Sequence, residues 1–339
     1  MNTMASRAAV LAAFVVFVAV APAFIGEGME RLGSEFFLLL TLATMWNLLA
    51  GYCGLMSLGQ QVFFGLGGYC VYFLSNKFGI VPYWVLPAAP LFSGAAAALC
   101  AIFLFRLRDA YFAIGSWVLA EIIALLVVKS PFFGGVSGLA LETLPLINFD
   151  WFEPTIFWIS GGVAAAGLVG SYLLPRSRLG FALMTIRDNE LAARSIGVDV
   201  WRARFIAFVI SGAGCGLAGS VSLLSDLTVS NGTAFSPNWV VAMMFIVIVG
   251  GIGTLEGPIL GTLIHFALRE VLTVMLGVSG TWYLVAMGLV AVVTMLFSPT
   301  GLWPMIRRRL GFEPLSVSRQ LPAHFRPEAA PSATAARSV

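Results

Sequence analysis

Charged residues are scarce in this 339-residue sequence, and the scarcity excludes a water-soluble protein. Only 10% of the residues are Asp, Glu, Lys or Arg, and 59% are hydrophobic. Soluble domains carry about 25% charged residues. Because a membrane-spanning helix takes about 20 apolar residues, the composition predicts an all-α integral membrane protein with about ten transmembrane helices.

Histidine and lysine are also rare, which disfavours two kinds of site. The only histidines, His265 and His324, fall in an expected span and near the C-terminus, so paired histidine metal ligands are not expected. The only lysines are Lys77 and Lys129, and neither follows glycine. A phosphate-binding loop needs Gly-Lys before Ser or Thr, so the chain is not predicted to be an ATPase, and we expect it to bind no cofactor.

Cysteine pairs and basic clusters of the nucleic-acid-binding kind are missing as well. The four cysteines show no CxxC spacing and lie in or beside apolar runs, which is typical of small packing residues; they are Cys53, Cys70, Cys100 and Cys215. The basic residues form no single patch, so no nucleic-acid partner is predicted.

Apolar runs separated by charge, glycine or proline predict ten spans. They lie near residues 8–25, 35–52, 61–75, 83–105, 110–128, 155–174, 205–225, 239–250, 258–277 and 282–297. The first run is longer than the apolar core of a usual signal peptide, so we expect a retained helix. Glycine-rich sequence at 51–68 and 250–261 predicts short or broken helices, whose backbone survives at membrane depth only inside protein or beside a cavity.

The arginines report the orientation of these spans. With the N-terminus inside and ten crossings, every basic residue falls on the inner side except Arg31, Lys77, Lys129 and Arg269, the last within a span. Cytoplasmic loops carry such an excess. We therefore expect both termini in the cytoplasm.

The sequence divides into two regions. Residues 1–303 form the expected transmembrane domain, which includes a charged cytoplasmic loop at about 175–204. In this loop Asp188 and Glu190 precede an alanine-rich stretch that Gly197 can end, which predicts a short helix. Residues 304–339 form a basic tail rich in proline and alanine that we expect to be disordered.

Polar residues inside the apolar runs are the candidates for function, because burying them in lipid is costly. Glu121 lies in the middle of a span and fits either a transport pathway or a contact with a neighbouring helix. Ser57, Gln60 and Gln61 lie beside the first glycine cluster. Helix packing explains much of the glycine, but these polar side chains favour a pathway or a buried interface.

Three segments resemble the LivM-type branched-chain amino acid permeases. They are GYCGLMSLGQQVFFGLGGYCVYFL from residue 51, RSRLGFALMTIRDNELAARSIGVDVWRARFIAFVISGAGCGLAGSVS from residue 176 and VIVGGIGTLEGPILGTL from residue 247. They occur in the family's order, and with the intervening spans the similarity covers about residues 35–303.

The resemblance implies a permease subunit of an ATP-driven importer. It would pair with a second, LivH-like permease, two cytoplasmic ATPase subunits that use ATP and magnesium, and a periplasmic substrate-binding protein. It also implies that the charged loop couples to an ATPase through a Glu-Ala-Ala then Gly pattern. Here that pattern resembles Glu190, Ala192, Ala193 and Gly197, with Leu191 inserted, and Arg187, Asp188 and Asn189 precede it.

The mechanism we expect is alternating access, with an amino acid zwitterion passing along hydrogen-bonding groups rather than a strongly charged pore. The candidates for that lining are Ser57, Gln60, Gln61, Ser116 and Glu121. A permease for urea, short amides or another small solute is an alternative. So is a secondary transporter driven by an ion gradient, with Glu121 as its ion site.

Overall fold

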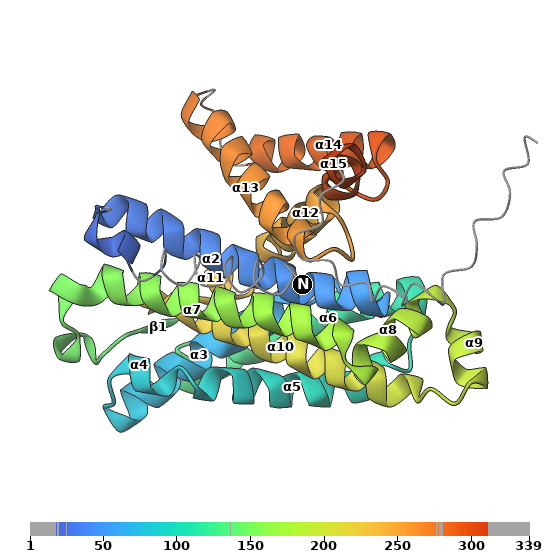
Figure 1. Ribbon diagram of the computed structural model, residues 1–339. Coiled ribbons are helices and arrows are strands. Elements are labelled where there is room, and N and C mark those ends of the chain that lie inside the picture. The colour runs from blue at the N-terminus through green and yellow to red at the C-terminus, as the bar shows by residue number, and fades with distance from the viewer. Residues whose placement is uncertain are drawn as a thin grey trace, which may run out of the picture.

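The computed structural model describes residues 18, 20–24, 26–135, 137–275, 277 and 281–310 (Figure 1). Most of the expected first span, at 8–25, and residues 311–339 lie outside the described residues. The remaining predicted spans all correspond to helices, in agreement with the all-α prediction.

The long helices form a bundle whose axes run in roughly the same direction (Figure 1). They are α2 (Glu27–Asn47), α3 (Gln61–Phe78), α5 (Ala88–Leu104), α6 (Asp109–Lys129), α7 (Phe152–Leu173) and α10 (Val200–Ser225). Short elements join them at the two ends of the bundle: α4 (Pro82–Val85), α8 (Arg178–Asp188), α9 (Glu190–Ser195), α11 (Asn231–Ala234), and a two-stranded ladder of β1 (Leu139–Ala140) with β2 (Thr228–Val229).

A second group of helices packs on α2, on the side away from α3 and α5 (Figure 1). It contains α12 (Asn238–Gly250), α13 (Glu256–Glu270), the π-helix Val271–Met275, α14 (Thr281–Phe297) and α15 (Leu302–Leu310). The prediction of a structureless tail from residue 304 is therefore wrong for 304–310, which continue a helix. Leu302 packs against the core and anchors this helix.

Seven helical segments among the described residues are long and apolar enough to cross a membrane. They are Gly28–Cys53, Pro82–Leu104, Asp109–Lys129, Phe149–Arg176, Val200–Ser225, Asn231–Gly250 and Trp282–Arg308. The expected spans at 61–75 and 258–277 correspond to α3 and α13, which are not among the seven. The total of about ten crossings stays a prediction.

Both glycine-rich segments are broken helices, as the sequence predicts. After α2 the chain passes through a π-helix, Leu48–Cys53, and leaves helical geometry at Gly54, which has φ +72°. Helix α3 begins seven residues later. At the second break, α12 ends at Gly250 and α13 starts at Glu256. Gly251 and Gly253 have positive φ values that a side chain would strain.

Glycine also allows close packing in the centre of the bundle, where α3 lies against α10 and α5. A Cβ atom on Gly67 would overlap the carbonyl oxygen of Gly216, and one on Gly219 would overlap that of Phe64. Membrane helices gain most of their association energy from such close contact, because lipid supplies no hydrophobic driving force between them. Thirteen of the residues of α3 are buried, so this helix is the core of the bundle.

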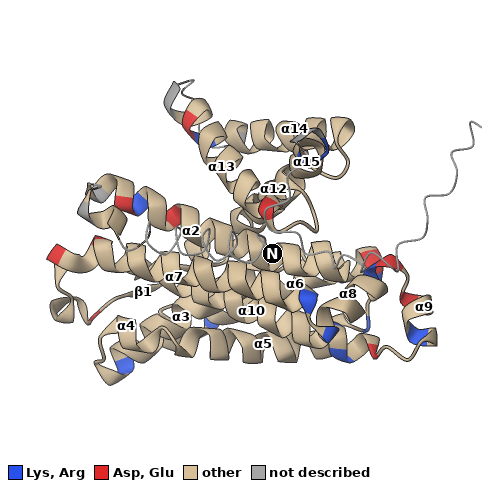
Figure 2. Ribbon diagram, in the orientation of Figure 1, with Lys and Arg blue, Asp and Glu red and all other residues tan. Residues whose placement is uncertain are grey.

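The two ends of the bundle differ in charge (Figure 2). Basic residues gather at the end that carries α8 and α9 (Figure 2). At the opposite end lie Arg31, whose partner Asp226 precedes β2, and Lys77, whose neighbour Asn76 bonds to Ala140 of β1. This distribution favours a cytoplasmic location for the α8–α9 end. The orientation in the membrane stays a prediction.

Substituting Gly67 by alanine tests the close packing of α3 on α10. The added methyl group overlaps backbone rather than a movable side chain, so we expect a loss of about 1–3 kcal/mol, typical of overpacking. The loss would appear as a lower apparent Tm of the purified protein. Gly162→Ala in α7 is the matched control, since nothing lies within 4 Å of that position. Equal melting of both variants would contradict the packing.

Candidate functional site: the junction of the charged loop with the broken helices

The charged loop folds into two short helices because polar side chains cap them. Ser177 accepts a hydrogen bond from the backbone N–H of Gly180 at the start of α8, and Asn189 accepts one from Ala192 at the start of α9. Asp199 caps α10 in the same way. Such caps satisfy backbone donors that a helix start leaves unpaired. Gly197, with φ +84°, follows α9, as the sequence predicts.

Two large apolar side chains, one on helix α9 and one directly after it, are exposed to solvent at the end of the bundle. Leu191 is 77% exposed and Ile196 is 69% exposed, whereas Ala193 is completely buried. Ala192 is exposed beside Leu191. Large apolar side chains together on a polar loop typically mark a contact surface.

Glu190 holds α9 in place rather than pointing away from the chain. Its carboxylate accepts from Arg194 at 2.6 Å and pairs with Arg204 of α10 at 2.9 Å. The carboxylate is thus shared by two guanidinium groups from different helices. Because such bonds are charge-assisted, the pairing orients α9 on the start of α10.

The two glycine-rich breaks meet at the side chain of Asn47. Its Oδ1 accepts from the backbone N–H of Gly253 at 2.8 Å, and its Nδ2 donates to the carbonyl of Thr254 at 2.8 Å. Gly51 lies so close to Gly253 that a Cβ atom on it would sit 2.5 Å from the Gly253 nitrogen. The amide therefore supplies hydrogen bonds that the interrupted helix cannot.

Arg187, at the end of α8, joins the charged loop to this meeting point. Its Nη1 donates to the carbonyl oxygen of Gly51 at 2.7 Å, and its Nε and Nη2 donate to Asp188 Oδ1 at 3.1 and 3.0 Å. The guanidinium also lies against Gly253. We call the group Asn47, Gly51, Arg187, Gly253 and Thr254 the coupling junction. A displacement of α8 would act on both breaks at once.

Four of the five expected pathway residues are buried within the chain. Ser57, Gln60, Gln61 and Ser116 are each at most 3% exposed. Ser116 Oγ accepts from the N–H of Leu58 and donates to the carbonyl of Ala113, so it supports the first break. In this conformation these residues line no open passage, and their place on the pathway stays a prediction.

The two glutamines differ from the serines because they carry polar atoms without partners. Gln60 Oε1 accepts from Cys215 at 3.2 Å, but its Nε2 is buried without a hydrogen bond, as are both amide atoms of Gln61. Such burial costs about 1–3 kcal/mol per group. A conformation or an occupant that satisfies these atoms would therefore be favoured.

Glu121 is the exception, since it lies on an exposed face of α6, about midway along the helix. Only 28% of the most apolar stretch of α6 is buried within this chain. A carboxylate facing lipid at that depth costs about 3 kcal/mol or more. The face of α6 around Glu121 thus requires a polar partner or water.

Sequence reasoning missed Asn47, Leu191 and Ile196. Asn47 is a polar residue in an otherwise apolar span, and this is the signal that could have identified it. Leu191 and Ile196 carry no such signal, because their exposure follows from how α9 packs.

Among the described residues no group of three His, Cys, Asp or Glu side chains could hold a metal ion.

Comparison with known proteins identifies the class. The family model described as branched-chain amino acid transport system, permease component, matches residues 28–295. The chain therefore belongs to this family of transmembrane permease subunits.

Individual relatives agree with this class. The high-affinity branched-chain amino acid transport permease LivM of Salmonella typhimurium is 27% identical over 326 residues, which cover 88% of this chain and 76% of the relative. The autoinducer 2 import permease LsrC of Enterobacter sp. is 30% identical and covers 79% of this chain and 77% of its own length. The ribose import permease RbsC of Escherichia coli is 30% identical over 44% of this chain and 48% of its own length. No solved structure matches.

Replacing Asn47 by alanine tests the coupling junction. The substitution leaves the Gly253 N–H and the Thr254 carbonyl without their partner, so we expect faster hydrogen–deuterium exchange at 251–255 and a loss of about 1–3 kcal/mol. Asn76→Ala is the matched control, because Asn76 makes the same kind of two-bond bridge at an exposed site, to Ala140 and Glu142. Unchanged exchange at 251–255 in Asn47→Ala would contradict the junction.

Proposed function

We propose that this chain is the LivM-type permease subunit of an ATP-driven importer of branched-chain amino acids in the bacterial inner membrane. The observation that carries the proposal is the coupling junction: the loop that exposes Leu191 and Ile196 is bonded through Arg187 to the first break at Gly51, and Asn47 bonds the first broken helix to the second break. Movement of that loop would reach the membrane interior through the side chains of Arg187 and Asn47, which bond directly to the backbone of the two breaks. The family and the LivM relative support the same assignment.

The partners follow from the surfaces that one chain leaves uncovered. Leu191 and Ile196 would dock into an ATPase subunit, which binds the ATP and magnesium that this chain does not. The exposed face of α6 would meet a second, LivH-like permease, and the solute would pass along that interface. A periplasmic binding protein would deliver the solute at the β1 end.

In this mechanism the chain transmits a mechanical change. Closure of two ATPase subunits would displace α8 and α9, and Arg187 and Asn47 would carry the displacement to the segments at 54–60 and 251–255. Non-helical segments can change their backbone angles with fewer lost hydrogen bonds than helices can. The two permeases would thereby exchange outward and inward openings, and hydrolysis would reset them.

The identity of the transported solute is the most specific part of the proposal. The similarity to LivM favours leucine, isoleucine and valine as substrates. The similarity to the autoinducer 2 and ribose permeases makes other small polar solutes alternatives, and urea and short amides are further alternatives. Uptake assays with a panel of these solutes would identify the substrate, and the proposed alternating-access mechanism is the same for each of them.

Leu191→Asp tests the docking of α9. A charge in the centre of an apolar contact costs about 2 kcal/mol or more, so ATP-dependent leucine uptake by the chain and its partner subunits in vesicles should fall about tenfold or more, and the ATPase should no longer co-purify. Leu146→Asp, a 52% exposed leucine at the opposite end, is the control. Uptake that needs an ion gradient but no ATP would instead establish the secondary transporter.

Glu121→Cys tests the face of α6. If this face borders a hydrated passage in the assembled complex, a membrane-impermeant maleimide should modify the new thiol. Leu289→Cys, on the exposed side of α14, is the control for a lipid-facing position and should react at least about tenfold more slowly, because the thiolate that reacts does not form in lipid. The four native cysteines are buried. Equal rates would contradict the passage.

A further inference from the structure

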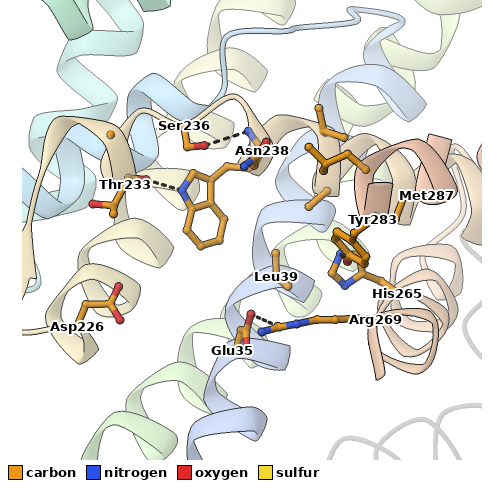
Figure 3. Close-up of a pocket in the computed structure, with 15 residues that line it drawn as sticks. Glu35, Leu39, Asp226, Thr233, Ser236, Asn238, His265, Arg269, Tyr283 and Met287 are labelled. Atoms are coloured by element: carbon orange, nitrogen blue, oxygen red, sulfur yellow. Dashed lines mark hydrogen bonds and ion pairs between the residues drawn. The ribbon is translucent and has the colours of Figure 1, made fainter. Parts of the chain in front are cut away.

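A cavity of about 760 Å³ lies beside Asp226, which follows α10 and precedes β2 in the chain (Figure 3). Its walls come from α2, the end of α10, α11 and α12, and from α13 and α14, so it separates the main bundle from the second group of helices. The proposed transport path follows the exposed face of α6, and no residue of α6 lines this cavity. Its volume is within the range of cavities that enclose drug-sized ligands.

Charged groups of both signs gather on one side of this cavity (Figure 3). Arg269 of α13 pairs with Glu35 of α2, and both side chains keep more than a third of their surface exposed. Asp226, just past the end of α10, is 46% exposed and has only a long contact of 3.4 Å with Arg31. Both carboxylates and the guanidinium therefore retain bonding capacity towards the cavity.

Asp226 lies in a partly desolvated and acidic environment. Burial raises the pKa of this carboxyl group, Arg31 lowers it, and the nearby Glu35 carboxylate raises it again. Two acidic groups thus face one cavity; Glu35 pairs closely with Arg269, whereas Arg31 lies 3.4 Å from Asp226. An added ammonium group would be attracted to this place.

Apolar side chains line the cavity about one helical turn away from Glu35, Arg269 and Asp226, which we call the charged level. Leu39 follows Glu35 on α2 by four residues, and Met287 follows Tyr283 on α14 by four, which places each about one turn further along its helix. Val241 and the ring of Trp239 complete this wall. The Trp239 indole N–H is already bonded to the carbonyl of Thr233, so the ring offers an apolar surface. The cavity is therefore amphipathic.

A buried histidine lies between the two levels. His265 is 5% exposed and lines the cavity, and its Nδ1 has no hydrogen-bond partner. Its Nε2 lies 3.4 Å from the Tyr283 hydroxyl. Buried polar atoms are nearly always partnered, so the packing around His265 leaves a polar group unsatisfied beside the cavity.

We propose that this cavity binds a zwitterionic phospholipid, with its ammonium group at Asp226 and Glu35, its phosphate at Arg269, and the start of one acyl chain along Leu39, Val241 and Met287. The charged level lies next to the end of the α10 span, which is where lipid headgroups reside. The occupied cavity joins the second group of helices to α2.

Two observations favour a lipid over a free amino acid, which has the same ammonium and acid chemistry. The cavity is much larger than one amino acid, and Val241 on its apolar wall is 41% exposed at the surface of α12. An anionic lipid fits less well, because it offers no ammonium group to the two carboxylates.

Native mass spectrometry of the full chain tests this proposal. The protein would be extracted into micelles that contain equal amounts of phosphatidylethanolamine and phosphatidylglycerol. We expect phosphatidylethanolamine to be retained about tenfold better, as one charge-assisted hydrogen bond predicts. The double variant Glu35→Gln/Arg269→Gln, which keeps the net charge, should lose this preference. Asp199→Asn/Arg202→Gln removes an ion pair at the opposite end as the matched control and should keep it.

Two further variants keep the test decisive if the double variant folds poorly. Asp226→Asn changes a half-exposed group and should also lose the preference for phosphatidylethanolamine. Val241→Trp fills the apolar wall and should reduce the retention of both lipids. Equal retention in the wild type and all cavity variants would overturn the proposal. Displacement of the lipid by free leucine would overturn it in favour of an amino acid site, and ATP-dependent uptake measured separately would report on the transport function.

Discussion

The structure depends on one constraint: every backbone hydrogen-bonding group at membrane depth must find a partner inside the protein. Continuous helices meet it automatically, but this chain interrupts two helices, at residues 54–60 and 251–255. Side chains complete the missing bonds. Trp46 donates to the carbonyl of Ser57 at 2.9 Å, Ser116 accepts from Leu58, and Asn47 serves Gly253 and Thr254.

This solution ties distant parts of the chain into one unit. Asn47 and Gly253 are 206 positions apart in the sequence, yet one amide joins them, and Arg187 bonds to Gly51 from a third segment. The breaks and the charged loop are therefore held by neighbouring bonds. Asn47 completes the second break, and Arg187 attaches α8 to the first break at Gly51.

The opposite end of the molecule is built differently. There the second group of helices leaves a cavity beside α2, bordered by the Glu35–Arg269 ion pair, instead of close glycine contacts. Close packing at the coupling junction and a fillable space at the β1 end are two ways to join the second group to the bundle. In the proposed mechanism the first would transmit movement directly, and in the proposed lipid site the second would adjust around the bound molecule.

Much of this architecture could be predicted from the sequence, because hydropathy and glycine act locally. Apolar runs identified the helices, and the glycine clusters identified both breaks. The charged loop was correctly predicted as helical, although one expected helix is two, since Asn189 ends one and caps the next. The chain beyond residue 303 was judged by its composition, which does not show that Leu302 anchors a further helix.

What the sequence by itself determined is the class of protein: an apolar helical chain, its glycine-rich breaks and its basic loop, each a property of neighbouring residues. Only the tertiary structure decided which polar groups support the fold and which remain available. Ser57, Gln60, Gln61 and Ser116 are enclosed, whereas Glu121 faces outward on α6. Asn47, an ordinary polar residue in the sequence, proves central because its two partners lie on another helix. The physical reason is that burial and hydrogen bonding depend on long-range packing, whereas hydropathy depends on composition alone.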